Sequence, residues 1–590
     1  MIKIKHWIQS FIVVSFDNTE GQIIDLVYPP EKEYTKRCLK NISFYSLPDT
    51  GSTTVQSPTV SHNFTFLLQS KTKSLNGVVH FVKLKSKTAK RGYVQRSLVL
   101  ISEHNFHQLF LKVVSLIGQV SLIEEDPTPM LKRAFEEIEK NWPKEINPQE
   151  VVGLKIFGRT LNSYFPSKLK LSIAKPLPPR DVVTNLYSNS NYICCDGFYG
   201  VDINLYSFFR NRIKELPLLW QLMIGQENLL ITSDQASLSS TMVLLLPSLI
   251  YPLIFKGTLY PYFTVQNSGL SKLAKKTFSK PKQDPNIKGN NNNKKKKKKN
   301  KKSNNLQDFR NDGIILGNSD PIFAQKILCH WENKWFLKSP SSKKKNKKSQ
   351  FVNEGYFSKT KPLTKFGSLI LKRLSKINKS KVEQEEKNIK CNLLLRKYFF
   401  VLTRKFLLPL EEYFLFLIEK LNPILPFYSD PIFKGFDENE FLQKFKDGQL
   451  SCDFNNPGQW APLYNKFIHT DTFMVWYETN KQRVIQQYSQ LYVNKILNFD
   501  IQSHISNMND TDKVDLFYRI TEKSQTIPIS TNIDLKNKIF QMLKIILSTL
   551  PNQYQQNLSE KLKQLEEAIN DESSSTGGDS ETESETSEEN

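Results

Sequence analysis

The chain has 590 residues, 39% hydrophobic and 12% aromatic, and this length allows two or three separate hydrophobic cores. Its formal net charge of +24 would suit a nucleic-acid-binding protein, but the excess is concentrated in two Lys runs, Lys272–Lys302 and Lys343–Lys348. Nucleic acid is therefore not expected as the primary partner. The six Cys form no CxxC motif, which argues against a disulfide framework or a zinc pattern and favours buried free thiols.

Neither secretion nor a membrane-spanning helix is expected. The apolar stretch from Trp7 to Phe16 is interrupted by polar residues, and no small-residue cleavage site follows it. The most apolar segment, Met242–Phe255, is too short to span a bilayer and contains Pro247 and Pro252.

The first segment, residues 1–175, is predicted to form an α+β domain with a sheet of about five strands. The turn residues Asp17–Gly21 separate two apolar runs and predict a β-hairpin that ends at Pro29 and Pro30. Helical spacing of apolar residues predicts two amphipathic helices. The expected strands are Phe11–Phe16, Gln22–Tyr28, His62–Gln69, Gly77–Leu84 and Gly92–Ser102, and the expected helices are His104–Leu116 and Met130–Asn141.

The second segment, residues 205–340, alternates short strands with helices, which indicates an α/β lobe with a parallel, helix-covered sheet. The Lys/Asn-rich stretch 271–305 falls between two of these strands and is expected to be a disordered loop insertion. The expected strands are Asn228–Thr232, Pro261–Val265, Gly313–Leu316 and Trp335–Leu337. The expected helices are Leu216–Gly225, Ser237–Leu246 (with Ser239 or Ser240 near its start) and Pro321–Cys329, capped by Asn318 or Ser319.

The third segment, residues 350–500, is predicted to be mainly helical, and residues 501–570 to add peripheral helices. Pro409 should kink or split the longest helix. Residues 571–590 form an acidic tail that is expected to be disordered. The expected helices are Lys365–Ile377, Leu393–Leu421, Glu438–Lys446, Thr472–Val493, Asp534–Leu550 and Leu558–Ile569.

The sequence contains none of the common catalytic motifs. GxxxxGK[ST], GxGxxG, GxSxG and HExxH are all absent. His104 and His107 could share a helix face, but two His within one turn are more often incidental than a metal site. We therefore expect no catalytic side-chain set, no metal and no cofactor, and a protein that acts by binding another protein.

Four clusters are dense in Gly, Pro and aromatic residues. Taken singly, each fits an ordinary structural role: a turn with a strand end, a strand start, core packing and a helix cap. The clusters are Gly21 and Gln22 with Tyr28, Pro29 and Pro30; Arg91, Gly92, Tyr93, Gln95 and Ser97; Leu219 and Trp220; and Gly317, Asn318, Ser319, Asp320 and Pro321.

In this order the clusters resemble the DENN family, and most of all its type 6 subfamily, over roughly residues 7 to 490. The upstream hallmark is similar to Ser15–Pro30 and Lys90–Ser102, with Ile42–Asp49 fitting the next strand and turn. The core and downstream hallmarks are similar to Leu216–Ile231, Tyr251–Val265, Gly313–Gln325 and Arg396–Phe414. The Lys-rich insertion, the second Lys run and the acidic tail depart from the family pattern.

The resemblance implies a longin-like upstream lobe, a core α/β lobe and a mainly helical downstream region. It also implies guanine nucleotide exchange on a Rab-family small GTPase, with the endosomal Rab type 14 expected for the type 6 group. The implied location is the cytoplasm and the surface of recycling endosomes. Weak contact of the Lys runs with an anionic membrane is a further expectation.

The alternative is a non-exchanging DENN scaffold or Rab effector in membrane traffic. The family signatures are mainly fold-defining, so they do not identify the GTPase contacts. We expect those contacts at core-lobe loops and helix starts, including Asn318 and Asp320.

Overall fold

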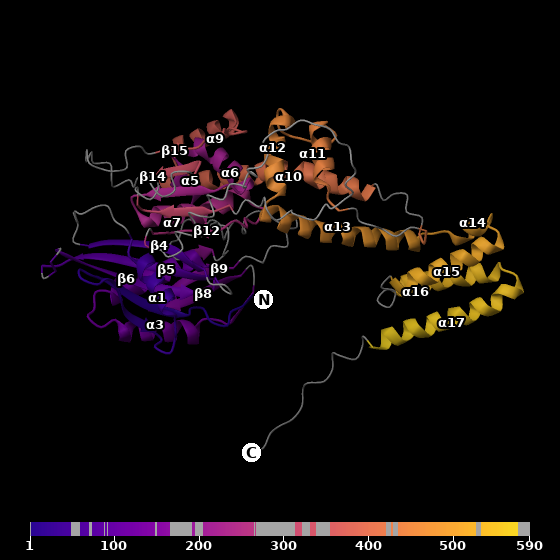
Figure 1. The fold of residues 1–590 in the computed structure, drawn as a ribbon, viewed down its shortest axis with the longest axis horizontal. Helices are drawn as coiled ribbons and strands as arrows, with labels where there is room; N and C mark the ends of the chain where they lie inside the picture. The colour runs from indigo at the N-terminus through magenta and orange to yellow at the C-terminus, as the bar shows by residue number, and fades with distance from the viewer. Residues whose placement is uncertain are drawn as a thin grey trace, which may run out of the picture. The chain divides into compact units, whose positions relative to one another are not determined.

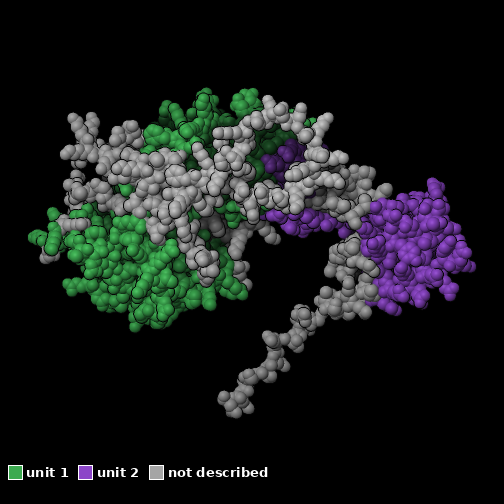
Figure 2. Space-filling view, in the orientation of Figure 1, with its two compact units in different colours: residues 1–408, 442–476 green, residues 409–441, 477–590 purple. Residues whose placement is uncertain are grey.

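The computed structural model describes residues 2–48, 59–69, 74–87, 89–90, 92–147, 150–165, 192–194, 204–264, 266, 313–320, 331–337, 355–419, 426–428, 435–526 and 533–575. The chain divides into two compact units (Figure 2). Unit 1 is Met1–Leu408 with Leu442–Trp476, and unit 2 is Pro409–Phe441 with Tyr477–Asn590. Unit 1 holds sheets and helices, whereas the described part of unit 2 is helical. The fold is therefore mixed α/β (Figure 1).

An antiparallel five-stranded sheet, the upstream sheet, forms the first layer of unit 1, with strand order β3-β2-β6-β5-β4. The predicted hairpin and all five predicted strands of this segment are confirmed. The strands are β2 (Ser10–Asp17), β3 (Gly21–Tyr28), β4 (Thr59–Gln69), β5 (Ser74–Lys85) and β6 (Tyr93–Ser102). The accompanying elements are α1 (Lys36–Ser46), α2 (His107–Ser121), α3 (Thr128–Asn141), β1 (Ile2–Lys3), β7 (Glu145–Ile146), β8 (Val151–Ile156), β9 (Arg159–Tyr164) and β10 (Tyr192–Cys194).

Both faces of the upstream sheet are buried, because neighbouring residues of a strand point to opposite faces. In β2, Phe11 and Val13 belong to the cluster that includes α2 and α3. Ile12 and Val14 belong to a second cluster that includes α1 and residues of the next lobe, such as Leu230 and Leu316. The two lobes of unit 1 therefore share a hydrophobic core.

The core sheet forms the second layer, with strand order β12-β13-β11-β14-β15. The predicted parallel arrangement is confirmed for the first four strands, and β15 adds an antiparallel edge. The strands are β11 (Leu229–Ser233), β12 (Leu259–Tyr260), β13 (Ile315–Asn318), β14 (Asn333–Leu337) and β15 (Gly355–Phe357). The helices of this lobe are α5 (Leu205–Phe209), η1 (Ile213–Glu215), α6 (Leu216–Ile224), α7 (Ala236–Leu245) and η2 (Leu246–Ile250).

Two predicted elements of unit 1 are wrong, and a predicted helix begins later than expected. Ile42–Asp49 was expected as strand and turn, but α1 covers it as far as Ser46, with Thr35 accepting a hydrogen bond from the Cys38 amide at its start. The predicted strand at Pro261 begins and ends earlier, as β12. His104 precedes α2, which starts at His107, so the two His do not share a helix.

The two serines expected near the start of α7 lie inside this helix, because it begins at Ala236. Asn318 is the last residue of β13. The helix predicted at 321–329 lies outside the described residues, as does the Lys-rich insertion. Of the described cysteine thiols, Cys391 is free and buried, whereas Cys38 and Cys452 are free and half-buried.

The remaining helices include the six predicted ones. The helices are α9 (Ser368–Lys379), α10 (Gln384–Glu419), α11 (Glu438–Lys446), α12 (Pro457–Ile468), α13 (Asp471–Leu497), α14 (Ile501–Ile505), α15 (Asp510–Thr526), α16 (Ile533–Ser548) and α17 (Asn552–Ser575). Of these, α12, α14 and α15 lie outside the predicted helix ranges. Helix α10 continues through Pro409, so the predicted split is wrong, although the boundary between the compact units falls at this residue.

Helices α13 to α17 contribute to one hydrophobic cluster in unit 2, which includes Ile496, Phe517, Ile539 and Leu558. Helix α17 extends to Ser575, so the first five residues of the tail predicted to be disordered from residue 571 are helical. The rest of the tail lies outside the described residues.

Candidate functional site at the carboxyl ends of the core strands

Two neighbouring parallel strands of the core sheet end in similar polar triplets. Strand β11 leads into Thr232-Ser233-Asp234, and β13 leads into Asn318-Ser319-Asp320. The register pairs Thr232 with Asn318, so the two triplets begin side by side. In open α/β sheets, ligands bind outside the carboxyl ends of the strands, where connections leave in opposite directions. Here β11 leads to β12 on one side, while β13 precedes β14 on the other.

Two side chains at this edge, those of Thr232 and Asn318, carry buried polar atoms for which the described residues provide no partner. The side chains of Thr232 and Asn318 are 0% and 1% exposed. The hydroxyl of Thr232 and both amide atoms of Asn318 have no hydrogen-bond partner in the part of the chain that the structure describes. An unsatisfied buried polar group costs about 1–3 kcal/mol, so these atoms mark the edge as a candidate binding site.

A glycine before the second triplet allows this edge to pack tightly. A Cβ atom at Gly317 would lie 2.3 Å from the carbonyl oxygen of Pro261 and 3.1 Å from that of Ser239. Both contacts are with backbone atoms, which cannot rotate away. The glycine is thus required for β13 to lie close to α7.

The carboxyl edge is joined to the upstream sheet through β4. The hydroxyls of Ser319 and Tyr262 are hydrogen-bonded at 2.8 Å, and the Tyr262 ring makes an edge contact with Phe64 of β4 at a centroid distance of 4.9 Å. In α7, the Ser240 hydroxyl accepts from the Thr65 amide at 3.0 Å and donates to the Thr65 carbonyl at 3.2 Å. We call this contact region between β4 and the core lobe the seam.

Electrostatics also link the seam to the first triplet. The half-buried His62 of β4 has a pKa below its usual value because burial disfavours the imidazolium, and the nearby Asp234 carboxylate acts in the opposite direction. The hydroxyl of Ser233 donates to Asp234 at 3.3 Å and accepts from the Gln235 amide at 3.3 Å, directly before α7. The edge is therefore acidic and rich in hydroxyl groups, which suits recognition of hydrogen-bond donors.

The upstream hallmark residues build the β2–β3 hairpin. Gly21 adopts a φ of +85°, in the left-handed region, and Asp17 accepts hydrogen bonds from the Thr19 and Glu20 amides within the turn. Gln22 donates through its side-chain amide to Gln266 of the core lobe at 3.0 Å. This hydrogen bond joins the hairpin to the core lobe shortly before the Lys-rich insertion in the sequence.

The end of the hairpin is defined by Tyr28, Pro29 and Pro30. The Tyr28–Pro29 peptide bond is cis, and the Tyr28 ring makes an edge contact with Phe135 of α3 at 5.6 Å. Pro29 accepts a hydrogen bond from the Lys32 amide at 3.1 Å, and Pro30 is exposed. These residues anchor the strand end to α3.

The second cluster lies at the start of β6. Gly92 has a φ of +72° and closes a turn by donating to the Ala89 carbonyl at 2.7 Å. The Lys83 ammonium lies 3.8 Å from the ring centroid of Tyr93, and Gln95 is the cross-strand neighbour of Lys83. Ser97 is buried and donates to the Ser46 carbonyl of α1 at 2.7 Å. Arg91 lies outside the described residues.

Leu219 and Trp220 are buried in α6. The Trp220 indole donates to the Thr403 hydroxyl of α10 at 2.9 Å, and its ring contacts Phe406 and Trp460. This pair therefore fastens the core lobe to the downstream helices of unit 1. Pro321 lies outside the described residues.

Of the predicted site residues that the structure describes, Asn318 and Asp320 lie at this edge. Sequence reasoning missed Thr232, Asp234 and Ser240. A signal for the first two was present, because both strands are followed by Ser-Asp: Ser233-Asp234 and Ser319-Asp320. The other hallmark residues support the fold around this edge.

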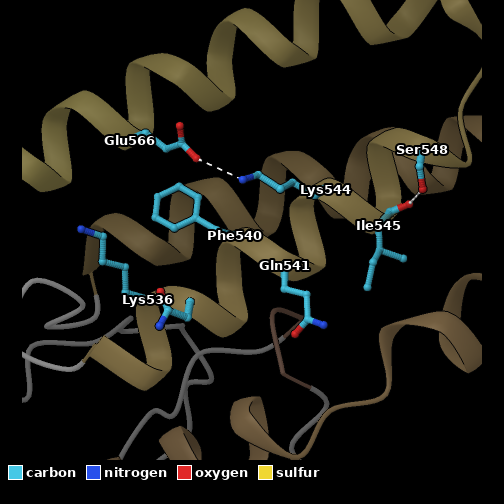
Figure 3. A pocket seen from close by; sticks show the side chains of 8 residues that line it. Lys536, Phe540, Gln541, Lys544, Ile545, Ser548 and Glu566 are labelled. Atoms are coloured by element: carbon cyan, nitrogen blue, oxygen red, sulfur yellow. Dashed lines mark hydrogen bonds and ion pairs between the residues drawn. The ribbon is translucent and has the colours of Figure 1, made fainter.

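Unit 2 carries a separate shallow groove of ≈ 600 Å³ between α16 and α17. Figure 3 shows Phe540 in this groove and the ion pair between Lys544 and Glu566 at 3.6 Å. Among the described residues, no group of His, Cys, Asp and Glu could hold a metal ion. None of the described helices is both long enough and apolar enough to cross a bilayer.

No protein-family model matches the chain. Three relatives align with nearly all of it. The chain is 26% identical to Protein DENND6B of Mus musculus, over 88% of this chain and 86% of the relative. It is 25% identical to Protein DENND6A of Gallus gallus, over 93% of this chain and 92% of the relative. It is 27% identical to Protein DENND6 homolog of Dictyostelium discoideum, over 92% of this chain and 81% of the relative.

Two packed sheets followed by helices define a mixed α/β protein whose hallmark residues are mainly structural. The similarity to the relatives extends over 88% to 93% of the chain. It confirms the resemblance found in the sequence, because the chain is similar over nearly its whole length to proteins of the DENN type 6 group.

Proposed function

We propose that this protein is a guanine nucleotide exchange factor for an endosomal Rab GTPase, with Rab type 14 as the favoured substrate. The observation that carries the proposal is the similarity to DENN type 6 proteins along both sheets and the helical region. DENN-family membership suggests small GTPases as partners generally. The same proposal identifies the upstream sheet as part of a longin-like lobe. It also places the lobe boundaries at residues 175, 205 and 340.

An exchange factor needs no nucleophile of its own. It binds the nucleotide-free GTPase more tightly than the loaded one, and this difference in affinity promotes GDP release. The GTPase switch loops are held away from Mg²⁺ and phosphate while the complex exists. The partner supplies both nucleotide and metal, so the protein acts as a regulator without catalytic side-chain chemistry.

We place part of the GTPase contact at the carboxyl edge of the core sheet. Asp320 is half-buried at this edge and offers a carboxylate to a partner. Asn318 is closed off from solvent, so its contribution would require the strand ends to open. Two adjacent triplets of hydroxyl, amide and carboxylate groups would accept hydrogen bonds from a displaced switch loop.

The protein would work in the cytoplasm and on the surface of recycling endosomes. The Lys runs at 272–302 and 343–348 would add a weak, salt-sensitive attraction to anionic membranes. This attraction is accessory to exchange. Deletion of residues 272–302 should weaken binding to anionic vesicles in low salt and leave the exchange rate in solution unchanged.

The deciding experiment measures release of fluorescent GDP from a panel of purified Rabs, with and without the full chain. We expect catalysed release from Rab type 14 and tight binding of its nucleotide-free form. An unchanged release rate across the whole panel would refute exchange activity. Stable Rab binding that does not depend on the nucleotide would instead identify a non-exchanging scaffold or effector.

A further inference from the structure

Helix α9 and the segment before it form an unusually basic part of unit 1. From Gly355 to Val382 the chain contains no Asp or Glu. The basic side chains here are Lys359, Lys361, Lys365, Lys372, Arg373, Lys376, Lys379 and Lys381. Lys359 pairs with Glu332, whereas Lys372, Arg373 and Lys376 are exposed and have no acidic partner among the described residues. A folded helix therefore presents unneutralised positive charge.

Exposed aliphatic side chains accompany this charge. Leu369 is 59% exposed, and Leu371 is also exposed, whereas only Leu374 of the helix is fully buried. Leu369, Lys372, Arg373 and Lys376 follow the i, i+3, i+4, i+7 spacing, so they share one face of α9. An apolar side chain among cations is the pattern of helices that lie in the headgroup region of a bilayer.

The segment that carries this face is firmly held. The Gln221 side chain accepts from the Leu363 amide at 2.8 Å and donates to the Lys361 carbonyl at 3.3 Å. Phe366 packs against the rings of Tyr398 and Phe399. At the other end of the helix, Asn378 is hydrogen-bonded to the Tyr206 hydroxyl.

Helix α9 lies away from the seam between β4 and the core lobe. In Figure 1, α9 lies on the far side of the core layer from β4. This separates the basic face from the edge proposed for GTPase contact.

We propose that the exposed face of α9 binds the surface of an anionic phospholipid bilayer. The cations would contact lipid phosphate and carboxylate groups, and Leu369 would enter the boundary between headgroups and acyl chains. The face is a structured site, distinct from the low-complexity Lys runs. The inference goes beyond nucleotide exchange and does not depend on it.

The test measures co-sedimentation of the full chain with vesicles of phosphatidylcholine containing a minority of phosphatidylserine. The double variant Lys372→Glu/Lys376→Glu should bind at least about tenfold more weakly than the original protein, because each cation adds to membrane affinity. Leu369→Ser should weaken binding severalfold without changing the charge. Vesicles of pure phosphatidylcholine should bind little protein.

The matched control is Lys132→Glu/Lys155→Glu, which makes the same charge change at exposed positions of α3 and β8. It should bind vesicles within about twofold of the original protein. Equal losses in the two double variants would show a general effect of net charge and overturn the proposal. Undiminished binding by the α9 variant, or equal binding to neutral vesicles, would also overturn it.

Discussion

The hydroxyl of Ser240 in α7 makes two hydrogen bonds to the backbone of Thr65 in β4, one to the amide and one to the carbonyl group. Strand β4 is the edge of the upstream sheet, and an unpaired edge is a site for aggregation. The Ser240 side chain thus bonds the backbone groups that a neighbouring strand would otherwise pair, and it joins the two lobes of unit 1.

Ser240→Ala should lower the free energy of unfolding of unit 1 by about 1–3 kcal/mol, because two buried backbone groups of Thr65 lose their partner. All seven Trp of the chain lie in unit 1, so urea unfolding followed by Trp fluorescence reports on this unit. Ser239→Ala is the matched control, since its hydroxyl donates to the Ala236 carbonyl of its own helix. Equal effects of the two substitutions would contradict the role of Ser240.

Thr403→Val should destabilise unit 1 by about 1–3 kcal/mol, because it leaves the buried Trp220 indole N–H without an acceptor. Trp220→Phe removes the donor and also leaves a smaller ring. If the hydrogen bond couples the two residues, the double variant should lose less stability than the two single losses added together. Strict additivity in Trp-fluorescence unfolding curves would argue against this coupling.

The stability of unit 1 should fall as the pH decreases from about 6.5 to about 4, partly through His80. Burial lowers the pKa of His80 from 6.5 to about 4. Between these values the unfolded chain binds a proton that the folded state excludes, so this contribution is complete above the higher pKa and is lost on acidification. The expected loss is up to about 3 kcal/mol.

His80→Gln removes this titration and keeps an amide able to bond Asn63, whose oxygen lies 2.6 Å from the His80 ring. Urea unfolding at a series of pH values should give a shallower dependence for the variant. His107, whose pKa is also lowered by burial to about 4, should maintain part of the slope. A pH dependence identical to that of the original protein would exclude His80 as a contributor.

Asn318→Ala should leave the stability of unit 1 within about 1 kcal/mol of the original, because its amide atoms have no partner in the described chain. Asp320→Ala should likewise fold. Both substitutions should slow catalysed GDP release from the substrate Rab if the carboxyl edge contacts it. Asp126→Ala, in an exposed turn of the upstream lobe, is the control and should exchange normally. A large stability loss with unchanged exchange would assign Asn318 a structural role.

All five strands of the upstream sheet and three of the five strands of the core sheet (β11, β13 and β14) could be predicted because their apolar runs are short and bounded by turn residues. In contrast, the strand and turn at Ile42–Asp49 were expected from the resemblance. The aromatic and β-branched residues around Ile42 and Phe44 also suit a strand, whereas packing against β3 and β4 favours the helix α1. The run after Tyr260 has strand propensity, but its side chains Tyr262 and Phe263 are buried in the cluster shared by the two lobes. Tertiary packing overrides local propensity in both places.

The candidate site was predictable only in part. Asn318 and Asp320 could be named because they follow a strand and precede a predicted helix. Their relation to Thr232 depends on strand register, which the sequence does not reveal, since another strand and the Lys-rich insertion separate the two triplets. The bond between Ser240 and Thr65 depends in turn on how the two lobes pack.

Unit 1 is built from two stretches of chain, with residues 409–441 between them. Within it, Phe406 stacks on Tyr464 at a centroid distance of 4.4 Å, and the Tyr464 hydroxyl donates to the Phe406 carbonyl. During synthesis the ribosome must therefore release more than fifty further residues after Phe406 before this contact can form. Until then Trp220 and Phe406 lack the packing that Trp460 and Tyr464 supply, and apolar surface exposed in this interval favours aggregation.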